Sequence, residues 1–102
     1  MSKDTAFVVR YTMRPETADA NQELVENVFA ELSRKRPEGV RYASLRLADG
    51  VTFVHVAIIE EGAMQLTDLA AFQEFQKGFA ERADGTPQAG PATVVGSWGF
   101  AP

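Results

Sequence analysis

The sequence predicts an α+β fold with its elements in the order β-α-β-β-α-β. Three observations lead to this prediction: strand-like runs rich in β-branched and aromatic residues, two segments with helical spacing of apolar residues, and an Asp-Gly pair between two strand-like runs. Right-handed crossovers and a central hairpin leave few topologies, of which the split βαβ, or ferredoxin-like, arrangement is the simplest. We therefore expect a four-stranded antiparallel sheet with two helices on one face.

The first strand and the first helix occupy the N-terminal third of the chain. Residues 6–13, AFVVRYTM, are typical of a strand because β-branched and aromatic side chains suit a pleated sheet. Apolar residues then recur at helical spacing over residues 18–35. Thr17 is the expected N-cap, and Pro37 follows the expected end of the helix.

The centre of the chain is expected to form a hairpin. Residues 40–48 and 51–59 are both strand-like, and Asp49-Gly50 between them tolerates the positive φ angles of a two-residue turn. This turn fixes the register of the two strands.

A second helix and a last strand complete the order. The apolar spacing predicts a helix over residues 68–82, with Thr67 as its cap. A loop rich in Gly and Pro follows, and the strand-like run ATVVGSWGF, residues 92–100, is the expected last strand.

Length and composition set the class of protein. A chain of 102 residues is expected to form one domain over residues 1–102. Its formal net charge of −4 argues against nonspecific nucleic-acid binding. Without cysteine it has neither disulfides nor thiolate chemistry. It has no apolar run of membrane-spanning length, and we expect no signal peptide. We expect a cytoplasmic protein.

Residues 51–59 are apolar on both faces of the expected strand, since Val54 and Val56 alternate with Phe53 and Ala57. A solvated face would carry polar residues, and two helices cover only one face of a four-stranded sheet. We therefore expect a homodimer with the two sheets packed face to face. The alternative is that the C-terminal segment or the preceding loop covers this face.

The hairpin register places the lone histidine among named neighbours. Ser44 is expected opposite His55, Arg46 opposite Phe53 and Tyr42 opposite Ala57, all on one mixed face. The other face of the hairpin is almost wholly aliphatic. The apolar stripes of the helices should prefer that aliphatic face, which would turn His55 toward the partner sheet.

The chain resembles the dimeric α+β barrel superfamily, and within it the small proteins of the antibiotic biosynthesis monooxygenase (ABM) type. The resemblance rests on AFVVRYTMRPETADANQELV, ADGVTFVHVAIIEE and LAAFQEFQKGF. It implies a homodimeric barrel and cofactor-free oxygenation of aromatic molecules. It also implies a pocket between sheet and helices, so the direction in which His55 points stays open. The first strand lacks the asparagine and the second helix the histidine of haem-degrading members, which argues against that activity.

The functional interpretation is a small-molecule pocket around His55. His55 would act as a general base on a phenol or enol, and Arg46 would hold the resulting oxyanion. The pocket would bind its ligand through four further residues: Tyr42, Ser44, Phe53 and Trp98.

The structural interpretation stands beside it. A buried neutral imidazole can be satisfied by Ser44 or a backbone carbonyl, and Arg46 can lie at the sheet rim with its head group in water. Trp98 and the stripe of Phe72, Phe75 and Phe79 are then core residues.

No cofactor or metal is expected. A single histidine cannot form a conventional zinc site, and no GxGxxG or P-loop is present. Two functions therefore remain: a cofactor-independent monooxygenase-like protein acting on a small aromatic or enolisable molecule, or a non-catalytic small-molecule-binding or structural homodimer.

Overall fold

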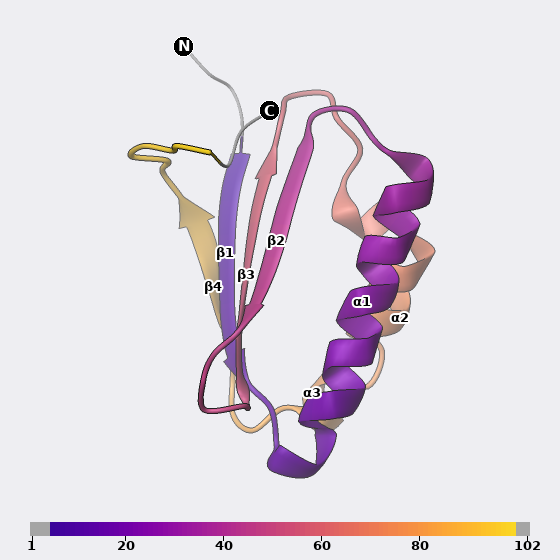
Figure 1. Cartoon of the computed structure of the whole chain (residues 1–102), viewed down its shortest axis with the longest axis vertical. Coiled ribbons are helices and arrows are strands. Elements are labelled where there is room, and N and C mark those ends of the chain that lie inside the picture. The colour runs from indigo at the N-terminus through magenta and orange to yellow at the C-terminus, as the bar shows by residue number, and fades with distance from the viewer. Residues whose placement is uncertain (1–4, 100–102) are drawn as a thin grey trace.

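A computed structural model describes residues 5–99 of the chain (Figure 1). The strands and helices, with two short 3-10 turns, are β1 (Thr5–Thr12), η1 (Pro15–Thr17), α1 (Ala18–Lys35), β2 (Val40–Arg46), β3 (Thr52–Ile59), η2 (Leu66–Asp68), α2 (Ala70–Gln76), α3 (Phe79–Arg82) and β4 (Gln88–Ala92).

The four strands form one antiparallel sheet in the order β2-β3-β1-β4. This is the predicted ferredoxin-like arrangement, with the two most apolar strands, β1 and β3, at its centre. The helices lie together on one side of the sheet (Figure 1). The predicted fold class is confirmed.

The predicted hairpin register is confirmed for the three pairs that concern the site: Tyr42 with Ala57, Ser44 with His55, and Arg46 with Phe53. The turn is longer than the predicted two residues, because β2 ends at Arg46 and β3 begins at Thr52. The Asp49 carboxylate accepts hydrogen bonds from the backbone N–H groups of Val51 and Thr52, at 2.9 and 2.8 Å. Gly50 supplies the positive φ of 80° that the turn requires.

Helix α1 has the predicted bounds. It ends where Arg36 adopts a left-handed conformation and its N–H donates to the Leu32 carbonyl at 2.7 Å, directly before Pro37. Thr17 occupies the N-cap position, but its side chain caps nothing in α1. The Thr17 hydroxyl donates instead to the Arg82 carbonyl at 2.7 Å, which ties the start of α1 to the end of α3.

The single helix predicted over residues 68–82 is divided into α2 and α3. Gly78 between them has a φ of 69°, which an α-helix cannot contain. The start of α2 is also not capped by Thr67, which lies in η2. The buried Glu31 carboxylate of α1 accepts the Ala71 N–H at 2.8 Å in place of a local cap.

The last strand lies earlier than predicted. Strand β4, Gln88–Ala92, falls in the Gly- and Pro-rich segment that was expected to be a loop, and pairs with β1. An edge strand needs hydrogen bonds on one side only, so Pro91 is tolerated there. Residues 93–99, which were predicted to belong to the last strand, form no strand. Val95 and Trp98 in this segment are 99% and 94% exposed.

The mixed face of the hairpin points to the helices. His55 lies against Phe75 of α2 and Tyr42 stacks on Phe29 of α1, with ring centroids 5.5 and 5.0 Å apart. The expectation that the helices would prefer the aliphatic face is therefore wrong. Their stripes carry phenylalanines, which pack against the rings of the mixed face.

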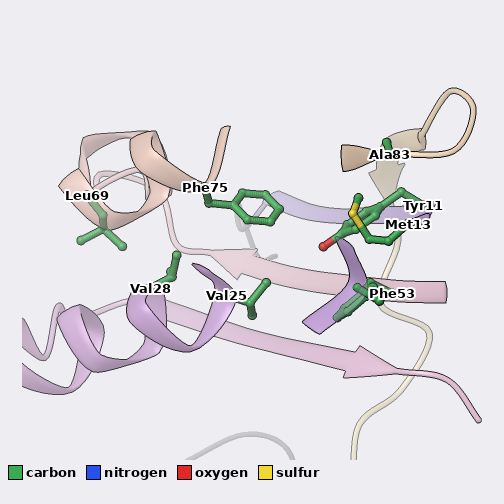
Figure 2. Packing of buried hydrophobic residues seen from close by; sticks show 9 residues of the cluster. Tyr11, Met13, Val25, Val28, Phe53, Leu69, Phe75 and Ala83 are labelled. Atoms are coloured by element: carbon green, nitrogen blue, oxygen red, sulfur yellow. The ribbon is translucent and has the colours of Figure 1, made fainter. Parts of the chain in front are cut away.

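The core lies between this face and the helices. Figure 2 shows Val25 and Val28 of α1 and Phe75 of α2 gathered with Tyr11 and Phe53 of the sheet. The largest fully buried side chains of the described residues are Phe53, Met13, Leu69, Val28 and Asn21. All but one are apolar, and the exception, Asn21, belongs to the candidate site.

The opposite face of the sheet is covered by none of the described helices. Val54, Val56 and Ile58 in the centre of this face are only half-buried, and Leu45 is 55% exposed. Among the described residues, no helix combines the length and apolar character needed to cross a membrane.

Candidate functional site

A cavity of about 610 Å³ lies between the sheet and the α2–α3 region. Its walls are mainly apolar and include four phenylalanines, Phe7, Phe72, Phe75 and Phe79. Tyr11, Tyr42 and His55 line it from the strands β1, β2 and β3, and the other polar residues of its wall are Thr5, Gln65, Thr67 and Gln76. Aromatic walls with a few polar groups are typical of sites for small organic molecules.

Tyr11 and Tyr42 are both hydrogen-bonded to His55. Nε2 of His55 lies 2.8 Å from the Tyr11 hydroxyl, and Nδ1 is hydrogen-bonded to the Tyr42 hydroxyl. His55 is 6% exposed, so the cavity reaches an imidazole that is nearly withdrawn from solvent. Both ring nitrogens of this buried imidazole are therefore satisfied by tyrosines.

The hydrogen-bond chain continues away from the cavity into the helices. Nδ2 of Asn21 in α1 donates to the Tyr11 hydroxyl at 2.9 Å. Arg82 in α3 donates to Oδ1 of Asn21 from Nε and Nη2, at 3.4 and 3.3 Å. The chain of side chains therefore runs from Arg82 through Asn21, Tyr11 and His55 to Tyr42.

The fold places each member of this chain. In the register of β1 and β3, Val9 pairs with His55 and Tyr11 with Phe53, so Tyr11 lies diagonally across from His55 on the same face. The left-handed Gly78 separates α3 from α2, and the Arg82 side chain of α3 reaches both Asn21 and α2. There Arg82 Nη2 donates to the Phe75 carbonyl at 2.6 Å, which satisfies the end of α2.

Stacked rings hold the tyrosines in place. Tyr11 lies parallel to Phe53 with centroids 5.5 Å apart and meets Phe79 edge-on at 4.9 Å. Tyr42 is stacked on Phe29. Because both rings are fixed by packing, the positions of their hydroxyls relative to His55 are fixed too.

Burial keeps the three titratable side chains of the cavity wall, Tyr11, Tyr42 and His55, neutral. It lowers the pKa of His55 to about 4, since the charged imidazolium would lose its hydration. Burial raises the pKa of Tyr11 to about 12, although the Asn21 hydrogen bond and the Arg82 charge oppose this, and it also raises the pKa of Tyr42. At neutral pH the site therefore carries no charge of its own beside Arg82.

Comparison with known proteins gives matches at the level of structure. No family model and no curated protein matches the sequence. SnoaB, a cofactor-independent oxygenase from Streptomyces nogalater, superposes with a TM-score of 0.67 at 18% identity, over 94% of this chain and 97% of that one. A protein from Nitrosomonas europaea assigned to the antibiotic biosynthesis monooxygenases gives 0.72 at 13% identity, over 93% of each chain. Rv0793 from Mycobacterium tuberculosis gives 0.72 at 14%, over 93% and 98%.

These likenesses extend over nearly the whole of each chain. The chain has the ABM-like fold. At these identities the likeness concerns the fold, and the chemistry of the site depends on the residues of this chain.

The ABM-like fold brings only some of the predicted site residues into the cavity wall. Tyr42 and His55 line it. Phe53 lies beneath the Tyr11 ring, and Ser44 pairs with His55 across the hairpin, but neither lines the cavity. Trp98 lies outside the sheet and is almost fully exposed, so the structure does not place it as an aromatic wall. Phenylalanines of α2 and α3 take that place.

Arg46 also lies away from the cavity. Its Nη1 donates to Asp19 at 3.1 Å and to Gln22 at 2.7 Å, both at the start of α1, and its Nε donates to the Gly50 carbonyl at 2.9 Å. The guanidinium is thus engaged at the rim of the sheet, as the structural interpretation expected. Arg46 is not placed to hold an oxyanion formed beside His55.

Three functional candidates were missed from the sequence: Tyr11, Asn21 and Arg82. Asn21 had a signal, because it precedes Val25 by four residues and Val28 by seven and so lies on the apolar stripe of α1. A polar residue on such a stripe must find a buried partner. Arg82 had no comparable signal, since its place depends on the break at Gly78.

Among residues 5–99, no group of three or more His, Cys, Asp or Glu side chains could hold a metal ion. The buried polar groups of the site are phenols, an imidazole, an amide and a guanidinium. They suit hydrogen bonding to an organic molecule.

Substitution of Tyr11 by Phe removes the hydroxyl that joins Asn21 to His55. We expect the free energy of unfolding to fall by about 1–3 kcal/mol, because a buried amide N–H and a ring nitrogen lose their partner. Tyr42→Phe is the matched control: its hydroxyl has His55 as its one partner, in a hydrogen bond that is only partly buried, so the loss should be smaller. Urea unfolding of both variants measures the difference, and equal losses would contradict the buried chain.

The lowered pKa of His55 predicts an acid-sensitive fold. The unfolded chain, with an ordinary imidazole pKa of 6.5, takes up a proton before the folded one does. The stability that the neutral imidazole contributes is present above pH 6.5 and is lost as the pH falls toward 4. We expect a decrease of about 3 kcal/mol over this range from this group.

Urea unfolding between pH 7 and pH 4 measures this decrease, with His55→Gln as the variant that should lack it. Because His55 is the only histidine, its NMR titration is free of overlap. An imidazole that titrates near pH 6.5 in the folded protein would contradict the prediction.

Proposed function

We propose that the protein binds a small aromatic or enolisable molecule in the cavity and oxidises it with dioxygen, without metal or flavin, as a monooxygenase-like protein. The observation that carries this proposal is the cavity itself, with phenylalanine walls and a hydrogen-bonded Tyr11–His55–Tyr42 cluster at its surface. Its volume of about 610 Å³ falls in the range of roughly 300–1,000 Å³ that is usual for sites of small organic ligands.

The proposed reaction needs an ionised substrate and dioxygen. One electron passes from the enolate to dioxygen, the two resulting radicals join in a carbon–oxygen bond, and protonation gives a hydroperoxide. Loss of water, by cleavage of the remaining C–H and the O–O bond, leaves a carbonyl group at that carbon. Substrate, dioxygen, product and water then balance. An apolar cavity favours this sequence because it excludes water from the reactive carbanion.

The side chains of this chain contribute binding and orientation. The phenylalanine walls hold the planar part of the substrate, and the hydroxyl of Tyr42 faces its oxygen. The predicted role of His55 as a general base stays a prediction, and its pKa of about 4 weighs against it. A role in orienting the Tyr11 and Tyr42 hydroxyls agrees better with the geometry. Substrates that ionise readily by themselves suit such a site.

Structural neighbours support the same proposal. SnoaB, a cofactor-independent oxygenase, shares the fold over nearly its whole length. At 18% identity this likeness concerns the fold alone. Whether a bound molecule reacts depends on the side chains of this cavity.

The second candidate is a protein that binds the same kind of molecule without reacting with it. One observation favours it: neither Arg46 nor a strongly basic group lies in the cavity wall, and His55 is held neutral between two tyrosines. The two candidates share the ligand class and differ only in turnover.

Anthrone, an enolisable aromatic ketone, separates the two candidates. Purified protein with a metal chelator is mixed with anthrone, and dioxygen uptake is followed together with the absorbance of anthraquinone. Catalysed uptake of one dioxygen per anthraquinone supports the oxygenase. Binding seen by fluorescence without faster uptake than in buffer supports the non-catalytic candidate, and absence of binding contradicts both.

Substitution of His55 by Ala should weaken anthrone binding by about tenfold, because two tyrosine hydroxyls lose the group that orients them. Arg46→Ala is the control, since Arg46 lies outside the cavity wall. Fluorescence titration measures binding, and thermal unfolding shows whether each variant is folded. A loss of binding for Arg46→Ala equal to that for His55→Ala would place the ligand elsewhere.

We further propose that two copies of the chain pack through the uncovered face of the sheet. This face carries Val54, Val56 and Leu45, and the burial of apolar side chains is the main source of association free energy. A symmetric homodimer covers both copies with one contact.

Light scattering at micromolar concentration should give twice the chain mass of 11.1 kDa. Val56→Asp should shift the protein to the monomer, because the contact would then bury an unpaired carboxylate. Ala20→Asp adds the same charge to the exposed side of α1 and should leave the dimer intact. A monomeric wild-type chain would contradict the proposal.

A further inference from the structure

In the chain of hydrogen bonds from Arg82 to Tyr42, the donor and the acceptor of each bond can be assigned in turn. A guanidinium can only donate, an amide donates through nitrogen and accepts through oxygen, and a phenol has one hydrogen to donate. A neutral imidazole donates from one ring nitrogen and accepts at the other. The direction of each hydrogen bond is therefore limited by the bond before it.

Arg82 sets the orientation of the Asn21 amide. Because Arg82 only donates, the group that it meets at 3.3 and 3.4 Å must be the amide oxygen, Oδ1. Nδ2 of Asn21 then faces Tyr11 and donates to its hydroxyl oxygen at 2.9 Å. Asn21 is 0% exposed, so water does not compete for either end of the amide.

The bond from Asn21 fixes the direction of the next hydrogen bond, between Tyr11 and His55. Its hydroxyl oxygen already accepts from Asn21, and its remaining neighbour in hydrogen-bond range among the described residues is Nε2 of His55, at 2.8 Å. The ring itself is enclosed by Phe53, Phe75 and Phe79, which accept no ordinary hydrogen bond. The Tyr11 hydrogen therefore goes to Nε2.

The charge of Arg82 favours the same direction. A cation at one end of the chain repels protons toward the other end, and in a site of low dielectric constant this effect is strong. The proton of the neutral imidazole then lies on Nδ1, the nitrogen farther along the chain. Nδ1–H donates to the Tyr42 oxygen.

Tyr42 is the last member, and its own hydrogen remains. Its oxygen accepts from Nδ1, and none of the described residues offers an acceptor for its O–H in the hydrogen bonds of the structure. The Tyr42 side chain lines the cavity. A bound molecule is the partner that can take this hydrogen.

We propose that the five side chains form a one-way chain of hydrogen bonds that ends in the Tyr42 O–H, so that the cavity selects aromatic molecules that present a carbonyl or enolate oxygen. This inference rests on the proposed function, because it names the class of ligand for the same cavity. The enolate oxygen is the group that carries charge before dioxygen reacts. A donor backed by a polarised chain and a cation stabilises that charge without becoming charged itself.

The imidazole tautomer tests the chain in the wild-type protein without any ligand. Long-range proton–nitrogen NMR on the single histidine should show the proton on Nδ1 and a bare Nε2 between pH 6 and pH 8. A proton on Nε2 would overturn the proposal. Asn21→Asp replaces the amide donor with a carboxylate acceptor of the same shape, next to Arg82. It should reverse the chain and move the proton to Nε2.

Three probes of similar shape test the ligand class: 1,4-naphthoquinone, with carbonyl acceptors; 1-naphthol, with a hydroxyl donor; and naphthalene, with neither. The absence of cysteine removes the thiol that a quinone would alkylate. The wild-type protein should bind the quinone about fivefold more tightly than naphthalene, the contribution of one neutral hydrogen bond. Tyr42→Phe and Asn21→Asp should both abolish that preference and still bind naphthalene.

The outcomes separate this inference from the proposed function. If naphthalene and the quinone bind equally to the wild-type protein, the proposed ligand class is wrong although the cavity binds aromatic molecules. If none of the three probes binds, the proposed function is wrong, and the tautomer measurement alone then decides the direction of the chain. If 1-naphthol is preferred over the quinone, the chain runs in the opposite direction.

Discussion

The hydrogen bonds of the buried Asn21 amide are the interaction on which the site depends. They join α1 to β1 through the Tyr11 hydroxyl and to α3 through Arg82. An amide that is fully withdrawn from water is destabilising by about 1–3 kcal/mol for each group left without a partner. The arrangement of these three elements is thus constrained by a polar group, whereas the surrounding core would tolerate small shifts between apolar surfaces. The positions of both tyrosine hydroxyls and of His55 follow from it.

The division of the second helix at Gly78 has a related consequence. One continuous helix would carry Arg82 onward along the helix axis, away from the end of α2. The left-handed glycine instead turns α3 so that the Arg82 guanidinium meets the Phe75 carbonyl and the Asn21 amide. The same side chain therefore satisfies the last turn of α2 and supplies the positive end of the chain that leads to the cavity. The left-handed backbone at Gly78 therefore determines where the positive charge of Arg82 lies relative to the hydrogen bonds of the site.

The features that could be predicted from the sequence depend on local residue patterns. The features that could not be predicted depend on tertiary contacts. The register of Ser44 with His55 followed from one turn, and the bounds of α1 followed from its apolar spacing and the proline after it. Strand β4 was misplaced because an edge strand tolerates the Gly and Pro that usually mark loops. The face toward which His55 points depended on aromatic stacking between distant elements. Arg46 was grouped with His55 by the hairpin register and Trp98 by its residue type. Neither argument tells where the end of a long side chain lies or how a C-terminal segment packs.

The neutral histidine changes what kind of chemistry the cavity favours. A catalytic base needs a pKa near that of the medium, and burial between two tyrosines moves His55 away from it. Burial strengthens the hydrogen bonds that the imidazole makes, because the low dielectric constant that destabilises its charge also leaves these dipoles unscreened. Burial therefore makes His55 a weaker base and a stronger link between the Tyr11 and Tyr42 hydroxyls. A cavity built in this way acts on a substrate by stabilising negative charge that the substrate already carries, so the acidity of the substrate, more than that of the protein, sets which molecules can react.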